Sequence, residues 1–241
     1  MIKMLQLNTF IMKINSRLFA TPILSLLTIL TLTFTSCKKD NSVNEPVVYG
    51  DASLKVVNTV QGSLAQDFFQ NDTKISTTPV AYGEATGYLT IKAGNSTISY
   101  KNTGSTTVNA TAGLGLNTND SFTVFYVSNA NGSGGIIGFL DDTVAPVTGK
   151  AKVRFVNIGA ALTNTINVNI TGGAALATGL QYTRSSVYST IDVNTGLTAT
   201  VLGSTTPISI PGVTFQTGKI YTVWFDAASS TSLNYHVIQQ N

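Results

Sequence analysis

The chain has 241 residues, of which 43% are hydrophobic and only 10% are charged, and it contains one Cys, one His and one Trp. A soluble domain usually carries about 25% charged residues. The polar surface must therefore come from Ser, Thr, Asn and Gly, as is typical of secreted β-structure. Residues 1–36 hold three basic residues and no acidic one, which leaves eleven of each in 37–241. This balance excludes binding to nucleic acid or anionic surfaces through net charge.

The first 36 residues have the three parts of a secretory signal. Basic residues precede an uncharged apolar run over 18–36, and small side chains close that run directly before Cys37. Met12 would begin a signal of more usual length than Met1, so both starts stay open.

Cys37 is the only cysteine, and Phe34–Cys37 resembles a bacterial lipobox. This resemblance implies a lipidated Cys37 and an outer-membrane lipoprotein of the cell envelope, with the face of the membrane undetermined. The alternative is an uncleaved transmembrane anchor, since about 20 apolar residues span a bilayer. However, Lys38 and Lys39 would then have to cross the membrane, against the positive-inside tendency. We therefore predict a lipoprotein signal peptide over 1–36 and a membrane-attached flexible tether over 37–51.

The rest of the chain contains a duplication. Three blocks recur in the same order at a shift of 99 or 100 residues: Ala52–Asn58 with Ala151–Asn157, Tyr82–Ile91 with Tyr182–Ile191, and Asp120–Tyr126 with Lys219–Phe225. The period is too long for a solenoid repeat. We predict two copies of one domain, module 1 over 52–143 and module 2 over 150–241, joined by a linker over 144–149.

Each module has the pattern of strands and turns. Apolar residues alternate with polar ones in segments such as Ile166–Ile170, and Gly- or Asn-rich breaks separate them. Seven or eight short strands in about 95 residues indicate an all-β fold of two tandem antiparallel immunoglobulin-like β-sandwich domains. A single barrel across both halves is the alternative, which Pro146 and the duplication disfavour.

The repeated blocks resemble the bacterial domain of unknown function 4397. The resemblance rests on Leu54–Asn58, Tyr82–Gly94 and Ser121–Tyr126 in module 1, and on Val153–Asn157, Tyr182–Ile191 and Gly218–Phe225 in module 2. It implies β-sandwich modules of envelope or secreted proteins and brings no catalytic residues.

Residues suited to catalysis or metal binding are few. His236 is predicted to be a strand-edge residue, because no G-x-S-x-G motif accompanies it. A glycosidase needs two facing carboxylates, yet Glu84 is replaced by Arg184 in the second copy. Asp141 and Asp142 are predicted to be solvated linker residues rather than a Ca²⁺ site. We expect no enzyme activity, no cofactor and no metal.

Aromatic residues give the positive indication of function. Alternation places Phe125 and Trp224 on the face opposite to Val124 and Val223. Tyr82, Tyr88, Tyr182 and Tyr188 form two further pairs, each six residues apart. Exposed aromatic rings beside Asn and Thr can stack on sugars or bind partners. The alternative is that each ring packs against a loop or the sister module.

These observations predict a non-enzymatic, lipid-anchored envelope protein that binds a glycan or a protein and no nucleic acid. A structural or accessory subunit of an envelope complex is the alternative, and a secreted hydrolase is less favoured. The sequence does not identify the ligand, the partner or the oligomeric state.

Overall fold

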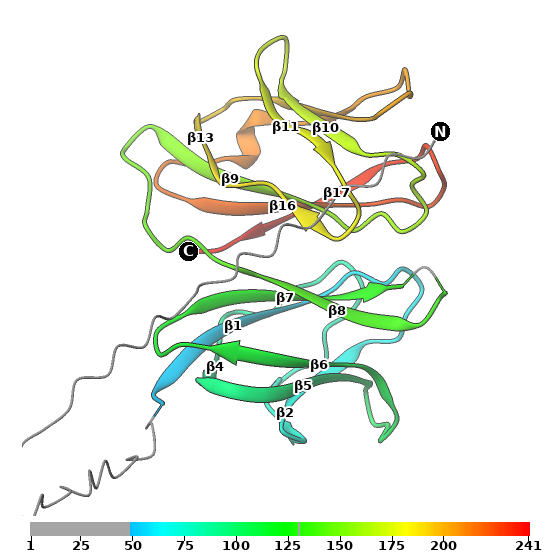
Figure 1. The fold of residues 1–241 in the computed structure, drawn as a ribbon. Coiled ribbons are helices and arrows are strands. Elements are labelled where there is room, and N and C mark those ends of the chain that lie inside the picture. Colours follow the sequence, from blue (N-terminus) through cyan, green and yellow to red (C-terminus); the bar gives the residue numbers. More distant parts are fainter. Residues whose placement is uncertain (1–48, 130) are drawn as a thin grey trace, which may run out of the picture. The chain divides into compact units, whose positions relative to one another are not determined.

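The structure is a computed structural model that describes residues 49–129 and 131–241 (Figure 1). The predicted signal peptide, Cys37 and most of the tether lie outside these residues. Within them, no helix is long and apolar enough to cross a membrane. The described residues form seventeen strands and one short 3₁₀ helix.

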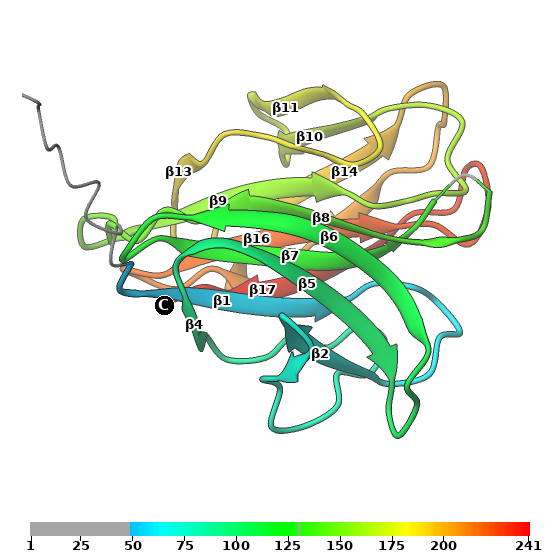
Figure 2. The same cartoon turned by 60° about the horizontal axis from the view of Figure 1, so that its bottom comes forward.

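Module 1 contains strands β1 to β8 in two four-stranded sheets, ordered β4-β1-β7-β8 and β3-β2-β5-β6. Figure 2 shows β2 and β5 of the second sheet lying against β1. The inward side chains between the sheets include Leu54, Phe68, Tyr100 and Val124. The bounds are β1 Asp51–Asn58, β2 Gln66–Gln70, β3 Thr73–Lys74, β4 Leu89–Lys92, β5 Gly94–Asn102, β6 Val108–Leu116, β7 Ser121–Ser128 and β8 Gly134–Leu140.

Module 2 repeats this topology with β9 to β17. Its sheets are ordered β12-β9-β16-β17, with β13 also paired to β9, and β11-β10-β14-β15. Val153, Phe155, Val223 and Phe225 belong to its core. The bounds are β9 Lys150–Asn157, β10 Ile166–Ile170, β11 Ala175–Leu180, β12 Arg184–Ser185, β13 Ser189–Asp192, β14 Leu197–Val201, β15 Ile208–Ile210, a 3₁₀ turn at Gly212–Thr214, β16 Ile220–Asp226 and β17 Asn234–Gln239. The predicted tandem β-sandwiches are confirmed.

The pairing is not antiparallel throughout. In each module the first strand runs parallel to a strand near the end of the module, β1 with β7 and β9 with β16. A parallel pair needs a long crossover between its strands. In each module the intervening strands, most of which belong to the other sheet, provide that crossover. The sequence pattern of short strands and tight turns predicted only antiparallel pairs and not this parallel pair.

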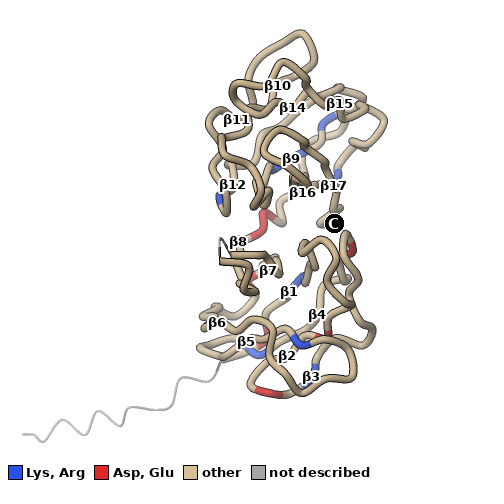
Figure 3. Tube along the Cα trace, turned by 90° about the vertical axis from the view of Figure 1, so that its right-hand side faces the viewer, with Lys and Arg blue, Asp and Glu red and all other residues tan. Residues whose placement is uncertain are grey.

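The two modules pack sheet against sheet. Figure 3 shows four successive layers. The two inner layers face each other, with β9, β16 and β17 of module 2 against β1, β7 and β8 of module 1, and the other sheet of each module forms an outer layer. A third apolar cluster fills this contact and draws on both modules: Val57, Phe125 and Val127 from module 1, and Val156, Ile158, Trp224 and Ile238 from module 2. We call this contact the inter-module interface.

The inter-module interface uses corresponding positions of the two copies. Val57 corresponds to Val156, and Phe125 corresponds to Trp224, each at a shift of 99 residues. Such a contact between equivalent surfaces resembles the isologous interface of a twofold-symmetric dimer. It explains why β1, β7, β9 and β16 are buried on both faces.

Candidate ligand-binding site

Phe125 and Trp224 lie in the inter-module interface. Both are 0% exposed, and the Trp224 ring stacks on His236 with 3.8 Å between ring centroids. The prediction that these two rings lie on the face of their strands opposite to the module cores is confirmed. Their predicted exposure is corrected, because the sister module covers the face on which they lie.

Three of the four predicted tyrosines form hydrogen bonds with the sister module. The Tyr82 hydroxyl donates to the Asp226 carboxylate, and its counterpart Tyr182 donates to the Ser128 carbonyl, so each bond crosses the interface. The Tyr88 hydroxyl lies 2.8 Å from Asp141 Oδ2 and 2.9 Å from Gln240 Oε1. Burial, reinforced by the neighbouring carboxylates, raises the pKa of Tyr82 and of Tyr88 well above its usual value.

Tyr188 completes this set. Its ring lies under the Arg154 guanidinium, whose central carbon is 4.9 Å from the ring centroid. Phe125 and Trp224 are therefore fully buried, whereas the four tyrosines are only partly exposed.

A buried ion pair joins the two modules within the interface. Arg154 Nη2 contacts Asp141 Oδ1 at 2.6 Å, and the two side chains are 2% and 0% exposed. Arg154 also donates to the Leu140 carbonyl at 2.9 Å and to Thr222 Oγ1 at 2.9 and 3.2 Å. Thr123 donates to Asp141 Oδ2 at 2.7 Å.

This network corrects the prediction for the two linker carboxylates. Asp141 is not solvated but is neutralised inside the interface. Asp142 is half-buried and forms an ion pair with Lys152 at 2.6 Å. Burial would raise the pKa of Asp142, but Lys152 and the Val144 N–H outweigh burial and lower it.

Lys55 occupies the position in module 1 that Arg154 occupies in module 2. It is buried and donates to the Thr86 carbonyl at 3.2 Å, with its ammonium 4.5 Å from the Tyr88 ring centroid. Burial lowers the pKa of Lys55, and the attraction of Asp141 offsets this only in part. At the shift of 99 residues, Gln240 of module 2 corresponds to Asp141 of module 1. Module 1 therefore contributes a carboxylate at a position where module 2 contributes a neutral amide.

His236 lies in the edge strand β17, as predicted. Its Nε2 is 3.4 Å from Asp226 Oδ2. Burial would raise the pKa of Asp226, but hydrogen bonds with His236 and Tyr82 lower it. Over residues 49–129 and 131–241, no group of three His, Cys, Asp or Glu is placed to hold a metal ion.

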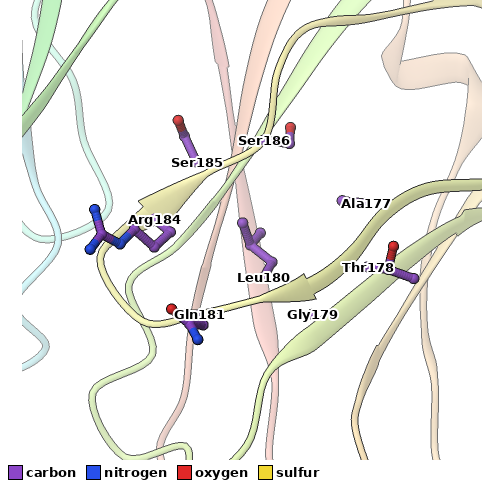
Figure 4. Close-up of a pocket in the computed structure, with 8 residues that line it drawn as sticks. All are labelled: Ala177, Thr178, Gly179, Leu180, Gln181, Arg184, Ser185 and Ser186. Carbon is purple, nitrogen blue, oxygen red and sulfur yellow. The ribbon is translucent and has the colours of Figure 1, made fainter. Parts of the chain in front are cut away.

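A surface depression of about 350 Å³ lies in module 2, where the chain passes from β11 to β12 (Figure 4). Leu180 supplies an apolar side chain between the two segments, and Arg184 is the charged residue of the lining. The remaining polar side chains are hydroxyls and an amide: Thr178, Gln181, Ser185 and Ser186. We call this depression site A.

A second depression of about 230 Å³ lies on the other side of Gln181, which lines both. Its lining combines the Tyr182 ring and apolar Leu162 and Leu202 with three polar side chains, Thr163, Asn164 and Thr165. The Thr165 hydroxyl is buried and has no hydrogen-bond partner among the described residues. We call this depression site B.

The short segment between sites A and B carries backbone strain. Thr183 has a φ of +60°, a conformation that β-branched residues rarely adopt, whereas the equivalent residue in module 1 is Gly83 with a φ of +85°. Strained positions cluster at binding and catalytic sites. The strain makes this segment the favoured functional candidate in the described part of the chain.

The sequence analysis named one residue of these two depressions as a binding candidate, Tyr182, which lines site B. It did not single out site A and noted Arg184 only as the replacement for Glu84. The sequence did contain an indication, because the two copies differ here, with Gly83-Glu84 in module 1 and Thr183-Arg184 in module 2. A functional loop can change in one copy while both copies keep the same sheets.

The fold and the site describe a tandem β-sandwich protein with a polar surface depression in its second module. Residues 52–163 match the family model described as "Domain of unknown function (DUF4397)". This match confirms the resemblance over module 1, the linker and the start of module 2. No curated protein shows a significant match.

Among solved structures, the chain is similar to a carbohydrate-binding module, CBMbc of family CBM26 from Eubacterium rectale Amy13K, in complex with maltoheptaose. The identity is 10% and the TM-score is 0.24, over 80% of this chain and 97% of that chain. A similarity at this level carries no information about the ligand of this chain.

Proposed function

We propose that this protein is a non-catalytic, lipid-anchored binding protein of the cell envelope, and that module 2 binds a glycan at site A. The observation that carries the proposal is the lining of site A, in which the hydroxyl, amide and guanidinium groups of Thr178, Ser185, Ser186, Gln181 and Arg184 gather around one depression whose floor is the buried Leu180. Sugars present many hydroxyl groups, which form hydrogen bonds with donors and acceptors of this kind.

The size and position of site A support a binding role. Ligand pockets usually have volumes of about 300 to 1,000 Å³ and few convergent polar groups, and about 350 Å³ lies within this range. Gln181 and Arg184 are exposed and therefore accessible to a large ligand such as a polymer.

The non-catalytic part of the proposal is supported by the placement of the carboxylates near the interface. Asp141 is paired with Arg154, and Asp226 accepts from Tyr82. Glu84 is exposed in module 1, at the position that Arg184 takes in module 2. A facing carboxylate pair, which glycosidases need, is therefore not assembled from these groups.

The alternative, an accessory subunit of an envelope complex, is favoured by apolar residues of the linker region. Leu140, Val144 and Val147 are large apolar side chains that remain mostly exposed. Exposed apolar residues close together are typical of surfaces that bind another protein.

Two variants of the full-length protein test the proposal. Screening on an array of bacterial and plant polysaccharides should give binding that Arg184→Ala weakens about tenfold or more, while Glu84→Ala, the matched change in module 1, leaves it intact. Equal binding by both variants would refute site A as the glycan site. For the anchor, Cys37→Ala should move the protein from the membrane fraction to the soluble fraction; unchanged pelleting would refute lipidation.

A further inference from the structure

We propose that sites A and B form one extended groove for a linear acidic polysaccharide, with a sugar carboxylate at Arg184 in site A and a neighbouring sugar ring in site B. This inference rests on the proposed glycan-binding function and adds the charge and the length of the ligand.

The two depressions are adjacent because Gln181 lines both. Its exposed amide offers donors and an acceptor, so it can bond to two successive sugars of a chain. Site B, at about 230 Å³, is smaller than most complete ligand pockets. It is better suited to one unit of a polymer than to a separate small molecule.

The chemistry of the two sites differs in a complementary way. Site A has the single cationic group Arg184 and no carboxylate in its lining. A guanidinium binds a carboxylate through two parallel hydrogen bonds, which favours an acidic sugar there. Site B has the Tyr182 ring and Leu202 beside the Asn164 amide, which can contact the C–H face and the hydroxyls of a sugar.

The groove is fixed in place before a ligand arrives. Arg184 pairs with Asn157 in the β12–β9 ladder, and the Tyr182 hydroxyl donates to the Ser128 carbonyl of module 1. Thr183 between them is held in its strained conformation. A site that is already ordered loses less conformational entropy on binding.

Calorimetric titration of the full-length protein with oligogalacturonates of one, two, four and six units tests the inference. The dissociation constant should fall about tenfold or more from the monomer to the tetramer and then level off. Fully methyl-esterified tetramer, which has the same backbone without charge, should bind about tenfold or more weakly.

Variants separate the two sites. Arg184→Ala should weaken tetramer binding about tenfold to a hundredfold, as expected for loss of a charged hydrogen bond. Leu202→Ser should weaken the tetramer and leave the monomer unchanged. Glu84→Gln is the control and should change neither. Because all three residues are exposed, a matched melting temperature verifies that each variant is folded.

The outcomes distinguish the inference from the proposed function. Binding that does not depend on length, on esterification or on Leu202 would overturn the extended acidic groove but leave glycan binding at site A. Binding of neutral cello-oligosaccharides alone would also overturn the inference. Failure of every acidic and neutral oligomer to bind would overturn both.

Discussion

The buried ion pair between Arg154 and Asp141 makes a sharp prediction about stability. Replacing Arg154 with Met removes the cation and its bonds to Asp141, Leu140 and Thr222, while it keeps an unbranched apolar side chain that reaches as far as the Arg154 Nε. Asp141 is then left as an unpaired charge inside the interface, with the Thr123 and Tyr88 hydroxyls as its remaining partners.

Breaking a buried ion pair by removing one partner costs about 3 to 5 kcal/mol. The two remaining hydroxyl contacts place the expected loss for Arg154→Met near the lower end, at about 3 kcal/mol. The double change Arg154→Met with Asp141→Leu removes both charges and should recover most of that loss, because apolar replacement of a whole buried pair is often neutral or stabilising.

Lys55 offers a matched control at the equivalent position of module 1. It is also buried, but within the described residues it forms no ion pair, and burial lowers its pKa. Lys55→Met should therefore change the free energy of unfolding by less than about 1 kcal/mol, or increase it. Urea denaturation measures these effects, and Trp224, the single tryptophan, reports on the interface by its fluorescence. A loss below about 1 kcal/mol for Arg154→Met, or an equal loss for Lys55→Met, would refute this reasoning.

Three further predictions follow from the strain, the interface and the tyrosines. Thr183→Gly should raise the free energy of unfolding by about 1 kcal/mol, because relief of strain exceeds the entropy cost of glycine, and Gly83→Thr should lower it by about 1 to 2 kcal/mol; opposite signs in urea titrations would contradict this. Trp224→Ala should cost about 3 to 5 kcal/mol by emptying the interface, measured by thermal unfolding with circular dichroism, and an unchanged melting temperature would mean that the ring is exposed in solution. Burial raises the pKa of Tyr88 and of Tyr100, so the unfolded chain loses these protons first and stability should fall as pH rises above about 10. The lowered pKa of Lys55 makes stability rise with pH, but the effect of several tyrosines is larger than that of one lysine. A free energy of unfolding that does not change from about pH 9 to 11.5 would exclude the raised tyrosine pKa values.

The sequence was sufficient to predict the faces of the sheets but not what covers them. Alternation in Ser121–Ser128 and Ile220–Asp226 separated the two faces of each strand correctly. It did not show which part of the chain packs against Phe125 and Trp224. A further indication was present, because Val56-Val57 and Trp224-Phe225 place large apolar residues on both faces in succession. Such continuous apolar runs are typical of strands buried on both sides. Only the three-dimensional packing identifies the sister module as the second layer.

The candidate site was less predictable for a different reason. The block containing Arg184 and Thr183 was recognised as a repeat of Glu84 and Gly83, and its differences were visible. The depression itself depends on how the chain leaves β11 and enters β12 in the opposite sheet. No local residue pattern specifies that path, since it follows from the separation of the two sheets by the core.

The parallel pairing of β1 with β7 has a consequence for how the chain acquires its structure. Ser53 pairs with Ser121, so the central pair of this sheet cannot form until nearly the whole of module 1 is available. Contacts this distant in sequence make folding slow. A growing polypeptide therefore stays open until the strands that complete this pair are available, and a premature stop before Ser121 should yield an unstructured, protease-sensitive product rather than a smaller stable domain.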